Sequence, residues 1–221
     1  MDQKFPNLYN LINHSYELFW FLDHLKQKHK NFELIIVDAG SNDSTGDYFK
    51  KIEKDKRIKI IISKGIKFYD GLRLGINNSL ADYIMFMPIS DCYASMYWLQ
   101  TCQNILDSND NISLVHGITI HNDDKDRKFY GSGTRHYCPS REKYFSFWLA
   151  TFFAYSEHSF CVRKSAYIKC MNKRIIEFDD YNKKFKDDIK IGLKDTFNEF
   201  LTFTYNFNTM GYLSEFVPEI T

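Results

Sequence analysis

Four short apolar runs, separated by helix-length segments, dominate the first 120 residues and most restrict the folds open to this chain. Each run has five to nine residues, is rich in β-branched and aliphatic side chains, and is bounded by turn-forming residues. Such runs are typical of strands buried on both faces of a parallel sheet. The segments between them carry apolar residues at spacings of three and four, which predicts helices. The expected strands are Glu33–Asp38, Ile58–Ile62, Tyr83–Met87 and Ile112–Ile120, and the expected helices are Leu11–Leu25, Thr45–Lys54, Tyr69–Ala81 and Ser95–Leu106.

This alternation predicts an α/β fold with a Rossmann-like, mostly parallel sheet flanked by helices. The length of 221 residues fits a single domain. The second half is less regular: His121–Arg127 predicts a solvated hairpin tip and Gly131–Gly133 another turn. Helices are expected over Arg163–Met171 and Asp195–Thr209, the latter ended by Gly211.

Composition excludes several classes of protein. Lys and Arg number 29 against 28 Asp and Glu, a net charge of +1, so no overall basic field exists to bind nucleic acid or an anionic membrane. The basic residues from Lys54 to Lys67 lack interleaved aromatic residues and are interpreted as solvated ends around a buried strand. The five cysteines are odd in number and widely spaced, which favours reduced thiols in a cytoplasmic protein over a disulfide framework or a zinc site.

No segment predicts a membrane span or a signal peptide. The longest apolar run, Ser146–Tyr155, is half of the about 20 residues that a spanning helix needs. Burial in the protein's own core is the first interpretation of this run, and contact with a lipid-linked acceptor or a dimer partner is the other. The N-terminus lacks the apolar core of a signal peptide. We therefore expect a soluble, cytoplasmic protein.

Polar residues follow three of the expected strands at their carboxyl ends, which is where open parallel sheets bind ligands. Asp38 ends the first strand, Lys64-Gly65 follows the second, and Ser90-Asp91 follows the third. Because these strand ends meet at one edge of a parallel sheet, the sequence predicts a single site there.

The loop Asp38–Thr45 allows more than one interpretation. A methyltransferase or dinucleotide-binding loop needs closely spaced glycines, but Asn42 and Ser44 stand where those glycines would be. Turn chemistry alone is another interpretation, since Asp and Asn form turns and Gly40 suits a strained backbone. Ser44 or Thr45 can cap the helix that follows.

Five segments carry recognisable motifs in a fixed order: Val37–Thr45, Gly65–Ile76 followed by Ala81–Ile84, Met87–Asp91, His158–Lys164 and Glu199. In this order they resemble the family-2 glycosyltransferases of the GT-A fold, and the capsule and colanic-acid type transferases are the closest likeness. The first three segments follow the strands and match the family's nucleotide-binding turn, its G-I-Y-D-A stretch and its acidic metal motif. The other two match its acceptor-side segment and its catalytic acidic position.

This sequence departs from the family pattern in several places. The opening strand is reduced to Phe5–Asn10, so we expect it to be short or missing. Ser90 stands where a second carboxylate often lies, Arg73 replaces an Asn, and two extra residues lie before Tyr69. Glu199 replaces an Asp, and the alignment of this position could shift to Asp195.

The resemblance implies an inverting transfer from a nucleoside diphosphate sugar, with a UDP-sugar favoured, to a glycan or lipid-linked acceptor in bacterial surface polysaccharide biosynthesis. Residues 1–115 would bind the nucleotide sugar and residues 116–221 the acceptor. Asp91 would bind Mg²⁺ or Mn²⁺, and with one carboxylate this metal could be weakly held or dispensable. Glu199, or Asp195, would be the catalytic base. The implied nucleotide-sugar contacts are Asp38, Gly40, Ser41, Asp43, Gly65, Asp70, Arg73, Ser90 and His158.

Each of these assignments has a structural alternative. Asp91 could cap the following helix, Asp70 and Arg73 could form an exposed helix pair, and Glu199 could be a solvated helix charge. A degenerate, non-catalytic protein that binds a nucleotide or a partner transferase is the second hypothesis, and a methyltransferase is the third. A homodimer and peripheral association with the inner face of the membrane are left open by the sequence.

Overall fold

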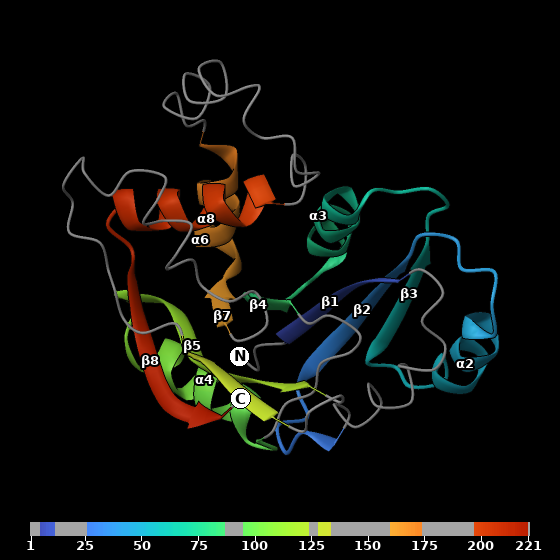
Figure 1. Ribbon diagram of the computed structural model, residues 1–221, viewed down its shortest axis with the longest axis horizontal. Helices are drawn as coiled ribbons and strands as arrows, with labels where there is room; N and C mark the ends of the chain where they lie inside the picture. The colour runs from blue at the N-terminus through green and yellow to red at the C-terminus, as the bar shows by residue number, and fades with distance from the viewer. Residues whose placement is uncertain are drawn as a thin grey trace.

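A computed structural model describes residues 5–11, 26–86, 95–123, 128–133, 160–173 and 197–220. From β2 to β5, the expected alternation of strands and helices is present (Figure 1). The helix expected over Leu11–Leu25 lies outside the described residues, except for Leu11, which ends β1. The strands are β1 (Phe5–Leu11), β2 (Phe32–Asp38), β3 (Ile58–Ile62), β4 (Tyr83–Phe86), β5 (Ile112–Asp123), β6 (Lys128–Gly133), β7 (Phe160–Arg163) and β8 (Leu213–Ile220). The helices are α2 (Thr45–Ile52), α3 (Phe68–Asn78), α4 (Trp98–Ser108), α6 (Lys164–Asn172) and α8 (Phe197–Thr209).

The strands form one mixed sheet in the order β3-β2-β1-β4-β7-β5-β6, with β8 beside β5. The strands β3, β2, β1 and β4 are parallel to one another. The strand β7 runs in the opposite direction and pairs antiparallel with both β4 and β5. The parallel half therefore brings the carboxyl ends of β2, β3 and β4 to one edge, which we call the carboxyl edge.

The first strand is neither short nor missing. All seven residues of β1 pair with β2, and β4 pairs with its other side. Pro6 and two Asn residues give this segment low intrinsic strand propensity. Its central position, with a partner strand on each side, supplies the backbone hydrogen bonds that the local sequence does not favour.

Three further sequence predictions need correction. Gly131–Gly133 is not a turn but the end of β6, because it pairs with Ile118–Ile120 of β5. The strand β5 itself runs on to Asp123, through the first residues of the expected hairpin tip. The helix expected over Tyr69–Ala81 ends at Asn78, so Leu80 lies beyond it, and its side chain is 82% exposed. The strand β3 is half-buried rather than buried, because it lies at the end of the sheet order.

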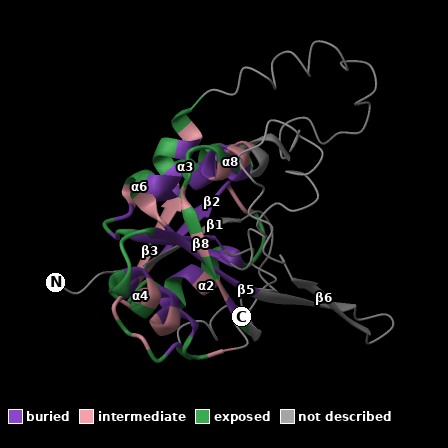
Figure 2. Ribbon diagram, turned by 90° about the vertical axis from the view of Figure 1, so that its left-hand side faces the viewer, coloured by how far each residue is buried: buried purple, intermediate pink, exposed green. Residues whose placement is uncertain are grey.

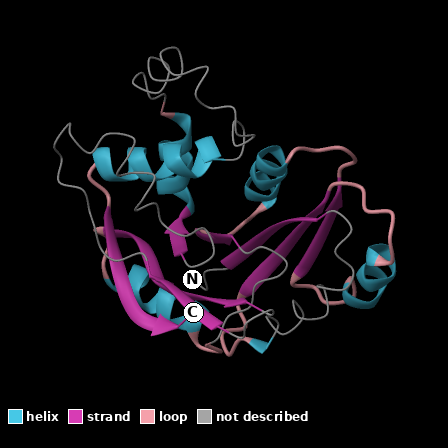
Figure 3. Ribbon diagram, in the orientation of Figure 1, coloured by secondary structure: helices cyan, strands magenta, loops and turns pink. Residues whose placement is uncertain are grey.

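The core has two faces, one on each side of the sheet (Figures 2 and 3). Alternate residues of β2 point to opposite faces: Ile35 and Val37 join α3, α6 and α8, whereas Phe32 joins the face that α4 covers. Both faces of β2 are buried, as its unbroken apolar run predicts. In the described part of the chain, none of the helices is long and apolar enough to cross a membrane.

Candidate functional site

The carboxyl ends of β2 and β3 lie side by side and are joined by hydrogen bonds beyond the sheet itself. Asp38 is in register with Ile62, the last residue of β3. One residue further on, the Ser63 N–H donates to the Asp38 carbonyl, and the Gly65 N–H donates to the Ala39 carbonyl, both at 2.8 Å. The turn after β2 and the turn after β3 therefore form one unit at the carboxyl edge.

Gly40 is required where these two turns meet. Its φ of +103° lies in the region that side-chain-bearing residues rarely adopt. A Cβ atom at this position would lie 3.0 Å from Lys64 Cγ and 3.3 Å from Lys64 Cα. Gly65 also has a positive φ, +73°, but nothing lies within 4 Å of the position that its Cβ would take. Backbone conformation alone explains Gly65, whereas both conformation and close approach explain Gly40.

Asp38 is buried, at 4% exposure, and its carboxylate organises the turn. The Ser41 N–H and hydroxyl donate to Asp38 Oδ1 at 3.0 and 2.6 Å. The other oxygen, Oδ2, has a longer contact of 3.3 Å with the same N–H. Because an ionised carboxylate offers about four lone-pair sites, Oδ2 retains capacity for a further donor.

Asp43, rather than Ser44 or Thr45, caps the helix that follows the turn. Its Oδ1 accepts hydrogen bonds from both the N–H and the hydroxyl of Thr45, which is fully buried. Ser44 occupies the N-cap position, but its side chain makes no capping hydrogen bond. Asp43 caps the helix in place of Ser44 because its carboxylate accepts hydrogen bonds from both the N–H and the hydroxyl of Thr45.

Asp70 and Arg73 lie on the exposed side of α3, five and eight residues after Gly65 in the second turn. Arg73 Nη1 lies 3.5 Å from Asp70 Oδ1, and both side chains are more than half exposed. This is the exposed pair that the sequence analysis gave as the structural alternative. The part of either residue in ligand binding stays a prediction.

The structure thus brings together Asp38, Gly40, Ser41, Asp43 and Gly65. The predictions for Ser90, Asp91, His158 and Asp195 lie outside the described residues, and only the backbone of Glu199, in the first turn of α8, is described. Within the described ranges, no group of three His, Cys, Asp or Glu side chains could hold a metal ion. Asp91 as a metal ligand therefore stays a prediction.

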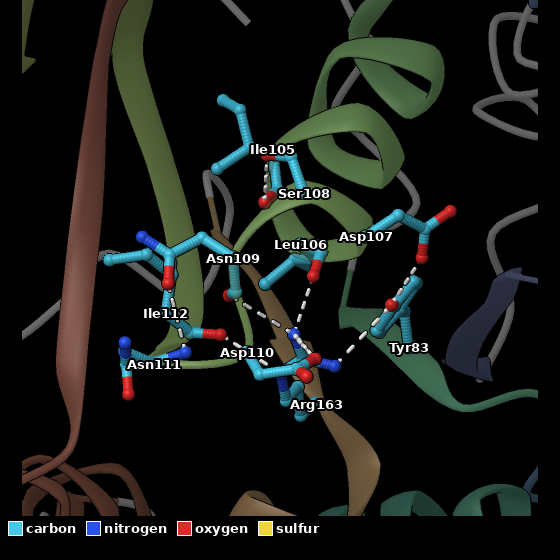
Figure 4. Close-up of polar contacts among 10 residues, drawn as sticks. All are labelled: Tyr83, Ile105, Leu106, Asp107, Ser108, Asn109, Asp110, Asn111, Ile112 and Arg163. Carbon is cyan, nitrogen blue, oxygen red and sulfur yellow. Dashed lines mark hydrogen bonds and ion pairs between the residues drawn. The ribbon is translucent and has the colours of Figure 1, made fainter.

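Sequence reasoning missed the role of Arg163, which joins four elements at the edge opposite to Asp38 (Figure 4). Its guanidinium donates to the carbonyls of Leu106 and Asn109 at the end of α4, and its Nε donates to the Ile112 carbonyl at 2.9 Å. It also lies 3.4 Å from the Tyr83 hydroxyl. The family likeness had placed Arg163 in an acceptor-side segment. An arginine directly after the apolar residues Phe160–Val162 was the available signal for a buried structural role.

Comparisons with known proteins agree with this architecture. The family model described as Glycosyl transferase family 2 matches residues 21–171. An uncharacterized glycosyltransferase of Rickettsia conorii is 36% identical over 90 residues, which cover 39% of this chain and 14% of that protein. One from Haemophilus influenzae is 33% identical over 93 residues, covering 41% of this chain and 28% of that protein. The chain thus matches less than a third of each of these relatives.

Two solved structures share the fold at low sequence identity. Residues 1–349 of TarS from S. aureus superpose with a TM-score of 0.66 at 13% identity, over 98% of this chain and 58% of that one. The mannosyltransferase PcManGT of Pyrobaculum calidifontis, in complex with GDP-Man and Mn²⁺, gives a TM-score of 0.63 at 11% identity, over 100% of this chain and 56% of that one. These structures support the GT-A type of α/β fold, and the family match spans most of the chain. The chain belongs to glycosyl transferase family 2.

Proposed function

We propose that this chain binds a nucleoside diphosphate sugar at the carboxyl edge and transfers the sugar, with inversion, to a hydroxyl group. The observation that carries the proposal is the joined pair of turns after β2 and β3, in a chain of this family. These turns place a buried carboxylate with a spare acceptor oxygen at the strand ends, where open α/β sheets bind ligands.

Asp38 Oδ2 would accept a hydrogen bond from the imino N–H of a uracil-type base, which favours a UDP-sugar. Ser41 holds Oδ1 and so fixes the plane of the carboxylate. Gly40 lets the turn pack closely against Lys64, Gly65 would leave room for the nucleotide over the turn, and Asp43 would support the turn through Thr45. Each of these roles uses a geometry that exists without the ligand.

In the transfer step, the acceptor oxygen forms a bond to the anomeric carbon while the bond from that carbon to the phosphate oxygen breaks. Glu199, or Asp195 as the other candidate, would take the acceptor proton, and the nucleoside diphosphate would leave with the bonding electrons. A single displacement of this kind inverts the anomeric centre. Arg73 would then offer its guanidinium to the diphosphate, and Ser90 and His158 would contact the donor phosphates or the acceptor.

Mg²⁺ or Mn²⁺, when bound by Asp91, would stabilise the negative charge that develops on the diphosphate. Support comes from PcManGT, whose structure contains Mn²⁺ and GDP-Man. The acceptor we propose is a glycan or a lipid-linked sugar at the cytoplasmic face of the membrane, as in capsule-type polysaccharide synthesis.

Calorimetric titration with UDP, GDP and CDP, with and without Mn²⁺, tests the proposal. We expect one nucleotide to bind and Mn²⁺ to strengthen that binding. Asp38→Asn should weaken nucleotide binding about tenfold or more, because the amide presents an N–H₂ where Oδ1 or Oδ2 accepts a donor. Absence of binding to all three nucleotides would contradict the proposal.

Turnover separates an active enzyme from the degenerate alternative. With the donor sugar of the nucleotide that binds, Asp91→Ala should abolish metal-dependent turnover. Glu199→Gln should reduce transfer by about 10²–10⁴-fold without weakening nucleotide binding, and Asp195→Asn should reduce it less. Equal losses for Glu199→Gln and Asp195→Asn would show that the base is misassigned. Nucleotide binding without any turnover of the wild type would favour a degenerate binding protein.

A further inference from the structure

The outermost parallel strand, β3, and the segments beside it carry a concentrated positive charge. Residues 50–67 include eight Lys or Arg and two Asp or Glu, a net charge of +6 in a chain whose total is +1. The excess is therefore local, and the near-neutral total conceals it.

The lysines of this stretch lie on the surface. Asp55 pairs with Arg57, and Asp47 pairs with Lys50, so these cations are already neutralised. The remaining six lysines are all exposed, and we call them the basic edge: Lys51, Lys54, Lys56, Lys59, Lys64 and Lys67. Among the described strands, none pairs with the outer side of β3, which lies at the right of the sheet in Figure 1.

Two large apolar side chains are exposed beside Lys64 and Lys67, at the carboxyl end of β3. Ile62, the last residue of β3, is 64% exposed, and Phe68, next to Lys67, is 42% exposed. Exposed apolar groups within a cluster of lysines match the chemistry of a bilayer interface, where lysine ammonium groups reach lipid phosphates and apolar groups enter the acyl boundary. Each lysine close to an anionic lipid surface strengthens binding by about fivefold.

We propose that the basic edge docks onto an anionic lipid bilayer. A nucleic acid partner would match the lysines but leave Ile62 without a role, since an aliphatic side chain cannot stack on bases. A second copy of the chain would place like charges face to face, and lysine on an edge strand opposes such pairing.

The position of the basic edge gives this docking a consequence for the site. Lys64 belongs to the basic edge and also lies against Gly40, in the joined turns. Lys64 and Lys67 follow β3 at the carboxyl edge, whereas Lys54 and Lys56 precede the strand at its other end. Docking through Lys64 and Lys67 would hold the carboxyl edge next to the lipid surface. This consequence rests on the proposed function, because a lipid-linked acceptor would be presented there; the docking itself does not.

Co-sedimentation with sucrose-loaded vesicles tests the proposal without any nucleotide sugar, so its failure is distinct from a failure of the transferase assignment. We expect the wild type to bind vesicles that contain 30% phosphatidylglycerol and not vesicles of phosphatidylcholine alone, with binding weakened by 0.5 M NaCl. The triple variant Lys54→Gln/Lys56→Gln/Lys59→Gln should bind about 100-fold more weakly. Ile62→Ser should lose about fivefold at unchanged charge.

A matched triple variant removes the same charge elsewhere: Lys28→Gln/Lys169→Gln/Lys173→Gln, all exposed residues. It should bind vesicles like the wild type, and all variants should keep the wild-type circular dichroism spectrum.

Equal losses of vesicle binding for the two triple variants would overturn the proposal, since total charge would then explain binding. Tighter binding to a duplex oligonucleotide than to the vesicles, or release from vesicles by millimolar pyrophosphate, would overturn it too. A third contradicting result would be a basic-edge variant that binds vesicles like the wild type but forms dimers in size-exclusion chromatography. The lysines would then serve to prevent strand pairing between copies of the chain at β3.

Discussion

Gly40 is the residue on which the geometry of the joined turns most depends, and a second glycine six positions later provides its control. Alanine at Gly40 must adopt φ +103° and place a Cβ 3.0 Å from Lys64 Cγ. We expect Gly40→Ala to lower the free energy of unfolding by about 1–3 kcal/mol. Gly46, in the first turn of α2, has nothing within 4 Å of its Cβ position. Gly46→Ala should therefore raise stability by about 0.4–1 kcal/mol.

Urea denaturation of both variants measures this difference. The nucleotide titration described above gives a second readout, because Gly40→Ala should also weaken binding whereas Gly46→Ala should not. Equal stability changes for the two glycines would show that the turn after β2 can move away from Lys64.

At the same scale, the sequence predicted where Asp38, Gly40 and Gly65 lie but not what their side chains and backbone contact. The end of an apolar run fixes a position at the carboxyl edge. It does not reveal that the Ser41 hydroxyl occupies one oxygen of Asp38, nor that Asp43 replaces Ser44 as the cap. Which acceptor bonds to a given N–H or O–H depends on the three-dimensional geometry of the turn. Turn propensities do not decide it, because they are nearly equal for these residue types.

At the scale of elements, Arg163 fixes the end of α4 against β5 and β4. Arg163→Met would remove the donor to the carbonyls of Leu106, Asn109 and Ile112. We expect a loss of about 2–4 kcal/mol in the free energy of unfolding, because partly buried acceptors lose their partner. Urea denaturation followed by circular dichroism measures this loss.

Asp110 provides the control for the charge of Arg163. Its carboxylate lies 3.7 Å from the guanidinium but is fully exposed, so Asp110→Asn should have no measurable effect. Arg163→Lys keeps the charge but loses the planar fork, and it should fall between the wild type and Arg163→Met. If Arg163→Met were as stable as Asp110→Asn, the carbonyl contacts would contribute nothing.

The connection from α2 to β3 contains a titratable contact whose pH dependence has a defined sign. Arg57 donates to both oxygens of Asp55, and this hydrogen bonding lowers the pKa of the Asp55 carboxyl below the ordinary value of 3.8. A folded-state pKa below the unfolded value means that the contact stabilises the fold above pH 3.8 and is lost as pH falls through the folded value.

Asp55→Asn should therefore lower the free energy of unfolding by about 0.5–1 kcal/mol at pH 7, since the pair is only partly exposed. The difference in the free energy of unfolding between Asp55→Asn and the wild type should become smaller below pH 3.8. Urea denaturation at several pH values from 7 to 3 measures this difference. Asp47→Asn removes a more exposed pair, in which the hydrogen bond from Lys50 also lowers the pKa of Asp47; solvent screening should make its pH-dependent difference smaller than that of Asp55→Asn, with the same sign. A difference that stays constant down to pH 3 would contradict the assigned ion pair.

Elements with strong local patterns were predicted best, and elements that depend on a distant partner were predicted worst. The apolar run of β2 and the spacing of α3 identify both elements without tertiary information. The strand β1 needs β2 and β4 on its two sides, and Gly131–Gly133 becomes a strand only because β5 is long enough to pair with it. In such pairings the partner strand lies outside the short stretch of sequence from which a strand is predicted, so that stretch alone does not identify the strand.

At the scale of the whole molecule, the two core faces share the strands of one sheet, which couples their stability. Phe160 and Phe203 stack at a centroid distance of 5.5 Å on the face of α6 and α8. Trp98, the first residue of α4, is fully buried on the opposite face. The residues between them belong to β4 and β7, whose alternate side chains enter both faces. Loss of either face exposes apolar surface of the same strands, so we expect the described part of the chain to unfold as one unit.

Phe203→Leu in a background of Trp20→Phe and Trp148→Phe tests this coupling, because Trp98 then reports only on the face that the substitution does not touch. The smaller side chain should lower the free energy of unfolding by about 1–2 kcal/mol. The urea midpoint of Trp98 fluorescence should fall by the same amount as that of far-ultraviolet circular dichroism. Met210→Ala, at a half-exposed position after α8, should leave both midpoints nearly unchanged. If Phe203→Leu moved the dichroism midpoint and left the Trp98 midpoint in place, the two faces would unfold independently, and the sheet would not transmit the loss of packing from one face to the other.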